Sequence, residues 1–417
     1  MTLRRTPQDF QVEEFLEPAV LEALAPAWSP ETPHAVYRLS KTGLTTPEAE
    51  QQVARALRVA VGQVHAAGLK DKHAATAQHI SVHAHAAAQA SALPQSRDHT
   101  RGPDAPGWRI RLLGWHAQPL QAACIARNAF QITVRGLRPG SYQRMQRRAE
   151  ALTLPGDEAG TLLLPNYFGD QRFGSVRHGK GFAAVPLLRG DTLGALRLLV
   201  GTPARKDMGR TRASTRLCAQ AWGQWPQLAR DLPACPERAP FEALARGATP
   251  EQAFRTLPRF LQLFCLEAFQ SAVWNQTVAR LVRSAAAHGS NAHDAAWSVQ
   301  SPAGELWFSP AAAWSMAHQQ QMLPLLTSSV PLQPPWGPHA VEALAEHGLT
   351  VEELQVPQEV GVHLGTALRP AVCVVRAFSL SQPVADERSA TADQKSIVRF
   401  ELPRGSYATV VLRALGE

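Results

Sequence analysis

Strand-like sequence occurs at both ends of this chain, and a long, mostly helical stretch lies between them. Residues 7–42 mix aromatic and β-branched residues with polar ones, and residues 128–134 have the same texture. Residues 397–402 and 407–412 are β-rich runs joined by residues 403–406, Pro-Arg-Gly-Ser, which is typical of a β-hairpin. We therefore expect an α+β protein in which the terminal strands share one sheet and the helical stretch is an insertion.

The length of 417 residues is too great for one ordinary core and indicates two domains. Residues 1–155 and 366–417 are expected to form a discontinuous first domain, and residues 156–365 the inserted second domain. The strongest amphipathic helix of the insertion covers residues 259–285. Its Phe269 and Trp274 have helical spacing on one face, so we expect them in the core and not in a stacking platform.

Three further segments have clear local preferences. Residues 46–61 are expected to form a helix, with Thr46 as N-cap, Pro47 in the first turn and Glu48 as an acidic first-turn residue. Residues 86–107 are rich in Ala, Ser, Pro and Gly and are expected to form a loop or flexible insertion. Residues 329–338 contain four prolines, so no regular structure is expected there.

The chain is basic, because 42 Lys and Arg against 34 Asp and Glu give a formal charge of +8 and an isoelectric point near 9.6. This balance favours a polyanionic partner such as nucleic acid. The basic residues are dispersed and form no polybasic tail or basic amphipathic helix. A surface for structured RNA is therefore favoured over a membrane surface.

The cysteines and the N-terminus indicate the cellular compartment. None of the five cysteines forms a Cys-x-x-Cys pair, so we expect reduced thiols and no zinc site. Asp9, Glu13 and Glu14 stand where a signal peptide needs an apolar stretch, and no apolar run reaches membrane-spanning length. A cytoplasmic protein is expected.

Residues 68–78, Gly-Leu-Lys-Asp-Lys-His-Ala-Ala-Thr-Ala-Gln, form the segment in which we expect the chemistry. Asp71 lies between Lys70 and Lys72, and nearby opposite charges favour an ionised carboxylate, which is a usable nucleophile. The alternating run from Gln78 to His83 predicts a half-buried strand directly after it. By itself, Lys-Asp-Lys would more often be an ordinary solvated turn.

Four other motifs occur in a fixed order along the chain. They are Pro-Gln-Asp-Phe-Gln-Val-Glu-Glu at residues 7–14, Asn-Ala-Phe at residues 128–130, Pro-Asn-Tyr-Phe-Gly-Asp-Gln-Arg-Phe-Gly-Ser at residues 165–175, and Leu-Pro-Arg-Gly-Ser-Tyr-Ala-Thr-Val-Val-Leu-Arg at residues 402–413. Together with the segment around Asp71, they resemble the tRNA pseudouridine synthase D (TruD) family over residues 6–413. The resemblance implies a pseudouridine-synthase-like mixed antiparallel sheet with flanking helices, plus an inserted, mostly helical α/β TRUD domain.

The resemblance also implies an activity, which is isomerisation of uridine to pseudouridine in tRNA, at uridine 13 of the D arm, without metal or organic cofactor. Asp71 matches the catalytic aspartate of the family, and Phe10, Asn128 and Tyr407 match positions that contact the target nucleotide. Phe130 lies in the same Asn-x-Phe motif. Two mechanisms remain open: Asp71 attacks the sugar or base, or it abstracts a ribose proton to begin elimination.

Aromatic faces suit this reaction, because they can stack on an extruded base without demanding one orientation, and an amide can orient the base edge. For Phe10 and Phe130, a place in the core of the sheet is the alternative. Tyr407 aligns with a position often filled by Phe, so its hydroxyl is expected to be dispensable.

The chain departs from the family in residues 116–127. The family commonly has a His-x-x-Lys-Leu-x-x-Gly element here, followed by a Gly at the position of Arg127. This chain lacks the Lys and both Gly. His79, His83 and His85 share one expected strand face. They have no acidic or Cys companion, so a solvated or RNA-facing surface is favoured over a metal site. Asp170 is interpreted as structural.

The sequence leaves two rival functions. The first is a non-catalytic tRNA-binding protein or tRNA chaperone on the same fold, which the altered residues 116–127 support and the intact Asp71 opposes. The second is a nuclease, for which the sequence offers no His pair or carboxylate cluster suited to metal-assisted phosphoryl transfer. The expected partner is tRNA, and the expected assembly is a monomer.

Overall fold

The computed structural model describes residues 3–102, 105–176, 178–288, 296–391 and 393–416. The chain divides into two compact units, and each is described by itself. The first contains Met1–Leu163, Val374–Ala408 and Leu415–Glu417, and the second contains Leu164–Cys373 and Thr409–Ala414.

The first unit is built on a mixed sheet of 11 strands. Along the sheet the strands are β5 (Ser96–Asp98), β6 (Gly107–His116), β2 (His34–Thr42), β4 (Ala75–His83), β1 (Phe10–Leu16), β7 (Ile125–Leu137), β15 (Gln394–Pro403), β13 (Val372–Leu380) and β8 (Leu162–Pro165), while β3 (Val64–Ala66) pairs with β4 and β14 (Val384–Ala385) with β15. β1 runs parallel to β4 and antiparallel to β7, which in turn runs antiparallel to β15. N-terminal and C-terminal strands therefore meet in one sheet, and the expected α+β class is confirmed.

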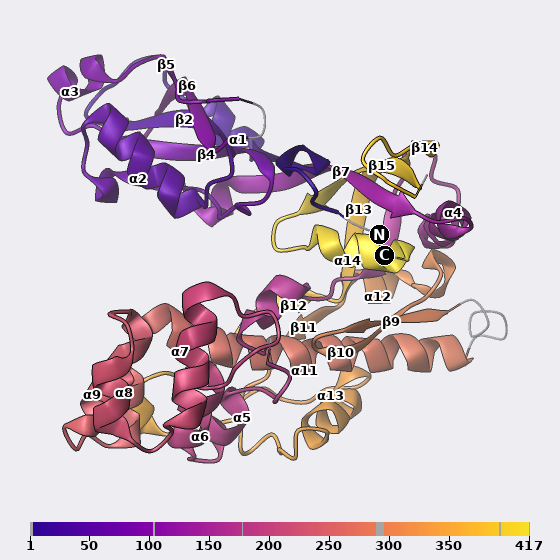
Figure 1. Ribbon diagram of the computed structural model, residues 1–417. Helices are drawn as coiled ribbons and strands as arrows, with labels where there is room; N and C mark the ends of the chain where they lie inside the picture. Colours follow the sequence, from indigo (N-terminus) through magenta and orange to yellow (C-terminus); the bar gives the residue numbers. More distant parts are fainter. Residues whose placement is uncertain (1–2, 103–104, 177, 289–295, 392, 417) are drawn as a thin grey trace. The chain divides into compact units, whose positions relative to one another are not determined.

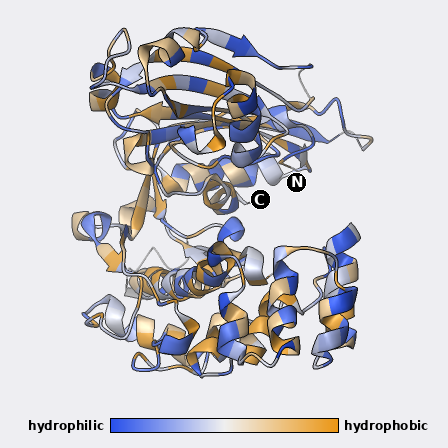
Figure 2. Cartoon of the chain, turned by 90° about the vertical axis from the view of Figure 1, so that its left-hand side faces the viewer, coloured by the Kyte–Doolittle hydropathy of each residue, from blue (hydrophilic) through white to orange (hydrophobic). Residues whose placement is uncertain are grey.

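One face of this sheet is buried, and we call it the buried face. Residues 10, 12, 14 and 16 of β1 are buried and residues 11 and 13 are exposed, which is the alternation of a strand with one covered side. Helix α2 (Thr46–Leu57) packs against β2 and β4 on the buried face, with Val53 in one cluster with Tyr37 and Ile80 (Figure 1). Figure 2 shows hydrophobic and hydrophilic segments interspersed along the strands of the chain. The other helices of this unit are α1 (Pro18–Glu22), α3 (Ala87–Ala92) and α4 (Ser141–Leu152).

The predicted C-terminal hairpin is wrong, because only its first half is a strand. β15 ends at Pro403, and the following Val-rich segment forms helix α14 (Ala408–Leu415). Val410, Val411 and Leu412 are all buried there, so tertiary packing outweighs the β-propensity of the sequence. The indole of Trp297 donates a hydrogen bond to the Ala414 carbonyl, which satisfies an acceptor at the helix end.

The expected helix at residues 46–61 forms, but its cap is shifted by one residue and it ends at Leu57. Thr45 is the N-cap and forms a capping box with Glu48. The hydroxyl of Thr46 is thereby free to bond elsewhere, and it donates to Gln78 Oε1 at 3.1 Å.

Two expectations of irregular structure are partly wrong. Residues 86–107 contain the short helix α3 and the strand β5, which pairs with β6, and residues 103 and 104 lie outside the described part. Residues 329–335 are irregular, but α13 begins at Trp336.

The second unit is mostly helical. Its helices are α5 (Ala184–Leu188), α6 (Thr192–Val200), α7 (Gly209–Gln220), α8 (Trp225–Asp231), α9 (Ala239–Ala245), α10 (Pro250–Arg255), α11 (Arg259–His288), α12 (Met316–Gln320) and α13 (Trp336–Ala345), and its strands β9 (Trp297–Ser301) and β10 (Gly304–Phe308), and β11 (Met322–Pro324) and β12 (Leu368–Pro370), form two small pairs. Helix α11 is the long helix predicted from the sequence (Figure 1). Phe269 and Trp274 are buried in it, as expected.

The Asn-Tyr-Phe-Gly motif at residues 166–169 is hydrogen-bonded to α11. The main chain of Phe168 exchanges two hydrogen bonds with the amide of Asn275, at 2.8 and 2.9 Å. The hydroxyl of Tyr167 donates to the Trp307 carbonyl at 2.7 Å. Asp170 forms an ion pair with Arg413 of α14. The motif therefore organises the core of the second unit, in line with the structural interpretation of Asp170.

No helix in the described residues is long and apolar enough to cross a membrane.

Candidate active site on the buried face of the sheet

Asp71 lies in the loop between β3 and β4, on residues 67–74, which we call the aspartate loop. Its side chain is 17% exposed, so it can be reached from solvent yet is largely enclosed. The Oδ2 oxygen forms an ion pair with Nη1 of Arg4 at 2.8 Å, and the Oδ1 oxygen accepts a hydrogen bond from the main-chain N–H of His73 at 2.9 Å. Both contacts hold the orientation of the carboxylate.

The two lysines beside Asp71 are engaged with other carboxylates. The ammonium of Lys70 contacts Glu14 at 2.5 Å, and that of Lys72 contacts Glu48 at 3.2 Å. Arg4 is the cation seen on Asp71. Sequence reasoning missed it, because Arg4 is distant from Asp71 in the chain and lies before the motif that begins at Pro7.

Three phenylalanines form a row across the buried face, and we call it the aromatic row. The rings of Phe10 and Phe130 meet edge to face with centroids 6.2 Å apart, and Phe130 stacks on Phe400 at 5.3 Å. The guanidinium of Arg4 lies 4.5 Å from the Phe10 centroid while it pairs with Asp71. The structure thus brings together three sequence-predicted residues, namely Asp71, Phe10 and Phe130, and adds Arg4 and Phe400.

Asn128 lies two residues before Phe130 on β7 and therefore on the same face of the sheet. Its partners in the neighbouring strands are Glu14 and Leu402. Its Oδ1 is buried without a hydrogen-bond partner within the described part of the chain. A buried acceptor without a partner is costly, so this amide is suited to binding a polar ligand group.

Tyr407 is half-buried in the connection between β15 and α14. It directly precedes α14, and its segment continues from the strand that carries Phe400.

The aspartate loop is anchored to buried polar residues. The main-chain N–H of Lys70 donates to the Thr46 hydroxyl at 2.9 Å, and Gln78 donates to the Gly68 carbonyl at 3.0 Å. Burial alone would raise the pKa of Glu14, but its hydrogen bond to His79 and the charge of Lys70 outweigh burial and hold that pKa below its usual range. Glu14 is therefore a buried carboxylate anchor for Lys70.

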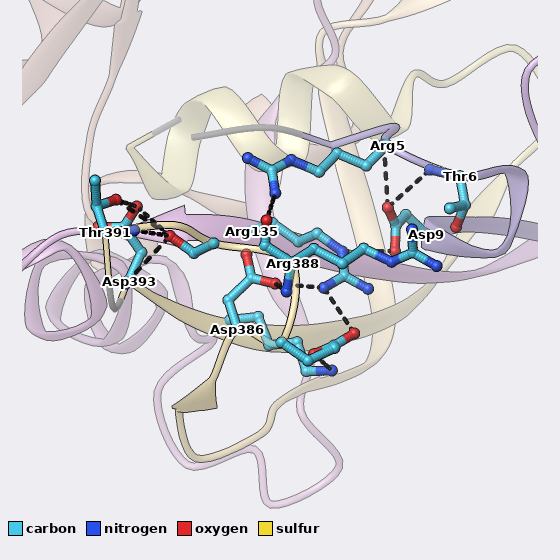
Figure 3. A network of polar contacts seen from close by, with 11 residues as sticks. Arg5, Thr6, Asp9, Arg135, Asp386, Arg388, Thr391 and Asp393 are labelled. Atoms are coloured by element: carbon cyan, nitrogen blue, oxygen red, sulfur yellow. Dashed lines mark hydrogen bonds and ion pairs between the residues drawn. The ribbon is translucent and has the colours of Figure 1, made fainter.

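A second buried network holds the N-terminal segment that carries Arg4 and Phe10 (Figure 3). Asp9 accepts hydrogen bonds from the main-chain N–H groups of Arg5 and Thr6, at 3.0 and 3.1 Å. Its other oxygen pairs with Arg135 at 2.9 Å, and Arg135 also pairs with Asp386 at 2.6 Å. One guanidinium thus ties the turn before Phe10 to β7 and to the segment before β15.

The three histidines expected on one strand face, His79, His83 and His85, have different surroundings in the structure. His79 is buried against Glu14, so the expectation of a solvated or RNA-facing residue is wrong for it. His83 lies between the rings of His34 and His85, with centroids 4.7 and 4.3 Å away. Across the described segments, no group of three or more His, Cys, Asp or Glu is arranged to hold a metal ion.

Comparisons with known proteins agree on one family. A family model described as tRNA pseudouridine synthase D (TruD) matches residues 1–415. The chain is similar to tRNA pseudouridine synthase D of Geobacter metallireducens, with 29% identity over 99% of this chain and 94% of the relative, and to a probable tRNA pseudouridine synthase D of Halobacterium salinarum, with 30% identity over 99% of this chain and 92% of the relative.

A solved structure has the same fold. The crystal structure of the putative tRNA pseudouridine synthase D (TruD) from Methanosarcina mazei matches with a TM-score of 0.65 over 99% of this chain and 92% of that chain, at 20% identity. The family match over nearly the whole chain agrees with the ordered motifs from residue 6 to residue 413. The chain belongs to the tRNA pseudouridine synthase D (TruD) family.

Proposed function

We propose that this protein converts uridine 13 in the D arm of tRNA to pseudouridine and that Asp71 carries the chemistry without a cofactor. The carrying observation is that a carboxylate, Asp71, and an aromatic face, Phe10, share one cation, Arg4. Phe10 itself is buried under Arg4, but its ring meets that of Phe130, which is partly exposed. A charged nucleophile or base thus lies near an aromatic ring on which a base can stack.

The reaction requires that the glycosidic bond of the target breaks and that uracil is reattached through carbon. The target nucleotide must first leave the stack of the RNA. In the proposed pose, the uracil stacks on the exposed part of Phe130, and the Asn128 amide bonds the base edge. Asp71, which Arg4 holds in place, attacks the sugar or base or takes a ribose proton.

The alternative is a non-catalytic tRNA-binding protein with the same fold. Its support is the altered element at residues 116–127, which lies at some distance in the chain from Asp71. A catalytic role is favoured because Asp71 is not merely present but is held by Arg4 and by the N–H of His73.

Pseudouridine mapping at single-nucleotide resolution tests the proposal. Unmodified tRNA is incubated with the wild-type protein, with Asp71→Asn, and with Asp231→Asn, whose carboxylate lies in a surface ion pair in the second unit. The wild type and Asp231→Asn are expected to convert uridine 13, with or without EDTA, and Asp71→Asn is expected to bind tRNA without turnover. Asp71→Asn activity within about tenfold of wild type would remove Asp71 from the mechanism.

A further inference from the structure

Lys41 is a lysine in an unusual position. It lies on β2, on the buried face, and is 2% exposed. Lysine is almost never fully buried unless its ammonium is paired, because removing a charge from water is costly. The side chain therefore has a role that offsets this cost.

The ammonium of Lys41 bonds three main-chain carbonyls. It donates to Leu44 at 2.8 Å, to Lys70 at 3.3 Å and to Asp71 at 3.1 Å. An ammonium has three donors, so these three bonds use its full capacity. Two of the three acceptors belong to the aspartate loop, and one of them is the carbonyl of Asp71.

The other anchors of the aspartate loop hold different atoms. Thr46 holds the N–H of Lys70, Gln78 holds the carbonyl of Gly68, and Glu14 holds the Lys70 side chain. Lys41 differs from these anchors because it bonds the main-chain carbonyl of Asp71 itself. The contact between Asp71 and Arg4 depends on where that main chain lies.

We propose that Lys41 is a positioning residue that holds the main chain of the aspartate loop so that the Asp71 carboxylate meets Arg4 and the target nucleotide. This inference rests on the proposed role of Asp71. It adds a residue that touches neither the substrate nor the reacting atoms and acts only through Asp71.

The protonation state of Lys41 provides a signature of this role. Burial lowers the pKa of Lys41 to about 8, the carboxylates of Asp71 and Glu48 act in the opposite direction, and the neighbouring Lys70 lowers it further. Below this pH the ammonium makes three charge-assisted bonds. Above it, a neutral amine has two donors for three carbonyls, so the aspartate loop loses part of its support and the reaction rate should fall as pH rises through about 8.

Single-turnover rates at saturating enzyme, measured from pH 6 to 10 on an unmodified tRNA transcript, test this. Lys41→Met keeps the apolar stem but removes all donors, so the rate at pH 7 should fall about 100-fold, as expected for a small misplacement of a catalytic group. Affinity for the transcript should stay within about threefold, because Lys41 does not reach the surface. Lys41→Arg keeps charge and donors above pH 10, so its decline at alkaline pH should shift to higher pH than in wild type.

Matched variants separate the possible results. Lys206→Met replaces an exposed lysine of the second unit, and its saturating rate should equal that of wild type. A folded Lys41→Met with wild-type rate, or a wild-type rate that is constant from pH 7 to 10, would overturn the inference. If Lys41→Met does not fold, the pH profiles of wild type and Lys41→Arg decide, and an unshifted decline in Lys41→Arg overturns it.

The proposed function can fail separately. An active Asp71→Asn would refute the role of Asp71 whatever Lys41 does. An inactive Asp71→Asn together with a fully active Lys41→Met would refute only the positioning role.

Discussion

Arg4 and Asp71 form an ion pair of 2.8 Å although one lies in the N-terminal segment and the other in the loop before β4. Parallel pairing of β1 with β4 accounts for this contact, because it brings the start of β1 beside the start of β4. Asp71 is thus held by a residue from the segment that leads into the neighbouring strand. The same guanidinium covers the ring of Phe10.

Replacement of Arg4 should impair the chemistry. Arg4→Gln removes the charge beside Asp71, so the single-turnover rate should fall by about 10- to 100-fold with little change in melting temperature. Arg5→Gln is the matched control, because Arg5 is the next residue and its side chain bonds the Arg388 carbonyl instead. Equal rates for the two variants would show that the ion pair with Asp71 has no catalytic role.

The aromatic row should divide between stacking and packing. Phe130 is partly exposed, so Phe130→Ala should lose about 1–3 kcal/mol of base stacking, seen in catalysis. Phe400 is 1% exposed, so Phe400→Ala should instead lower the free energy of unfolding by about 3–5 kcal/mol. Tyr407→Phe should behave as wild type because stacking uses the ring. Thermal melts beside single-turnover rates check this, and a folded Phe130→Ala with normal rate would place Phe130 in the core only.

The network around Arg135 should be essential for stability. Arg135→Met leaves the carboxylates of Asp9 and Asp386 buried without their cation, which should cost about 3–5 kcal/mol of unfolding free energy. Arg138→Met, three residues later on an exposed position, is the control and should change it by less than about 0.5 kcal/mol. Chemical denaturation measures both, and similar midpoints would show that the network contributes nothing net.

His34 lies near three other histidines, and this group should make the stability of the fold sensitive to mild acid. Burial and the charges of His83, His65 and His116 lower the pKa of His34 to about 4. The unfolded chain then binds more protons than the folded one between about pH 6.5 and 4, so stability falls as pH falls through that window.

Melting temperatures at pH 7.5 and 5 should therefore differ less for His34→Gln than for wild type. His363→Gln replaces an exposed histidine and should keep the wild-type difference. An unchanged difference in His34→Gln would assign the acid sensitivity to other groups.

Salt should weaken tRNA binding if the exposed arginines of the second unit contact phosphates. Arg210 and Arg216 are exposed on α7. Replacement of either arginine by Glu should weaken binding to tRNAs of any sequence. It should also reduce the slope of log affinity against log salt concentration by about 1. Arg246→Glu, on an exposed turn after α9, is the control of equal charge change, and an equal effect at Arg246 would mean that only net charge matters.

Much of the fold follows from local sequence. The alternation in β1, the helix α2 and the long helix α11 are set by the period of their apolar residues, which local sequence displays. The alternating run after Asp71 does form the strand β4, but residues 78–82 are all buried, so the expectation of a half-buried strand is wrong. The ordered motifs also point directly to Asp71 and Phe130. These features are predictable because they depend on neighbours in the chain.

Other features were decided by the tertiary structure. The segment from Ala408 to Leu415 has β-propensity but is a helix, because its apolar residues are buried on all sides. Thr46 resembles a helix cap, yet it bonds Gln78 and Lys70, which strand pairing brings close. Arg4 reaches the site from the segment before β1, Lys41 from β2 and Phe400 from β15. The sequence by itself determined which residue types are available for the chemistry, whereas pairing across the sheet decided which of them meet, because a contact between distant residues leaves no period in the chain.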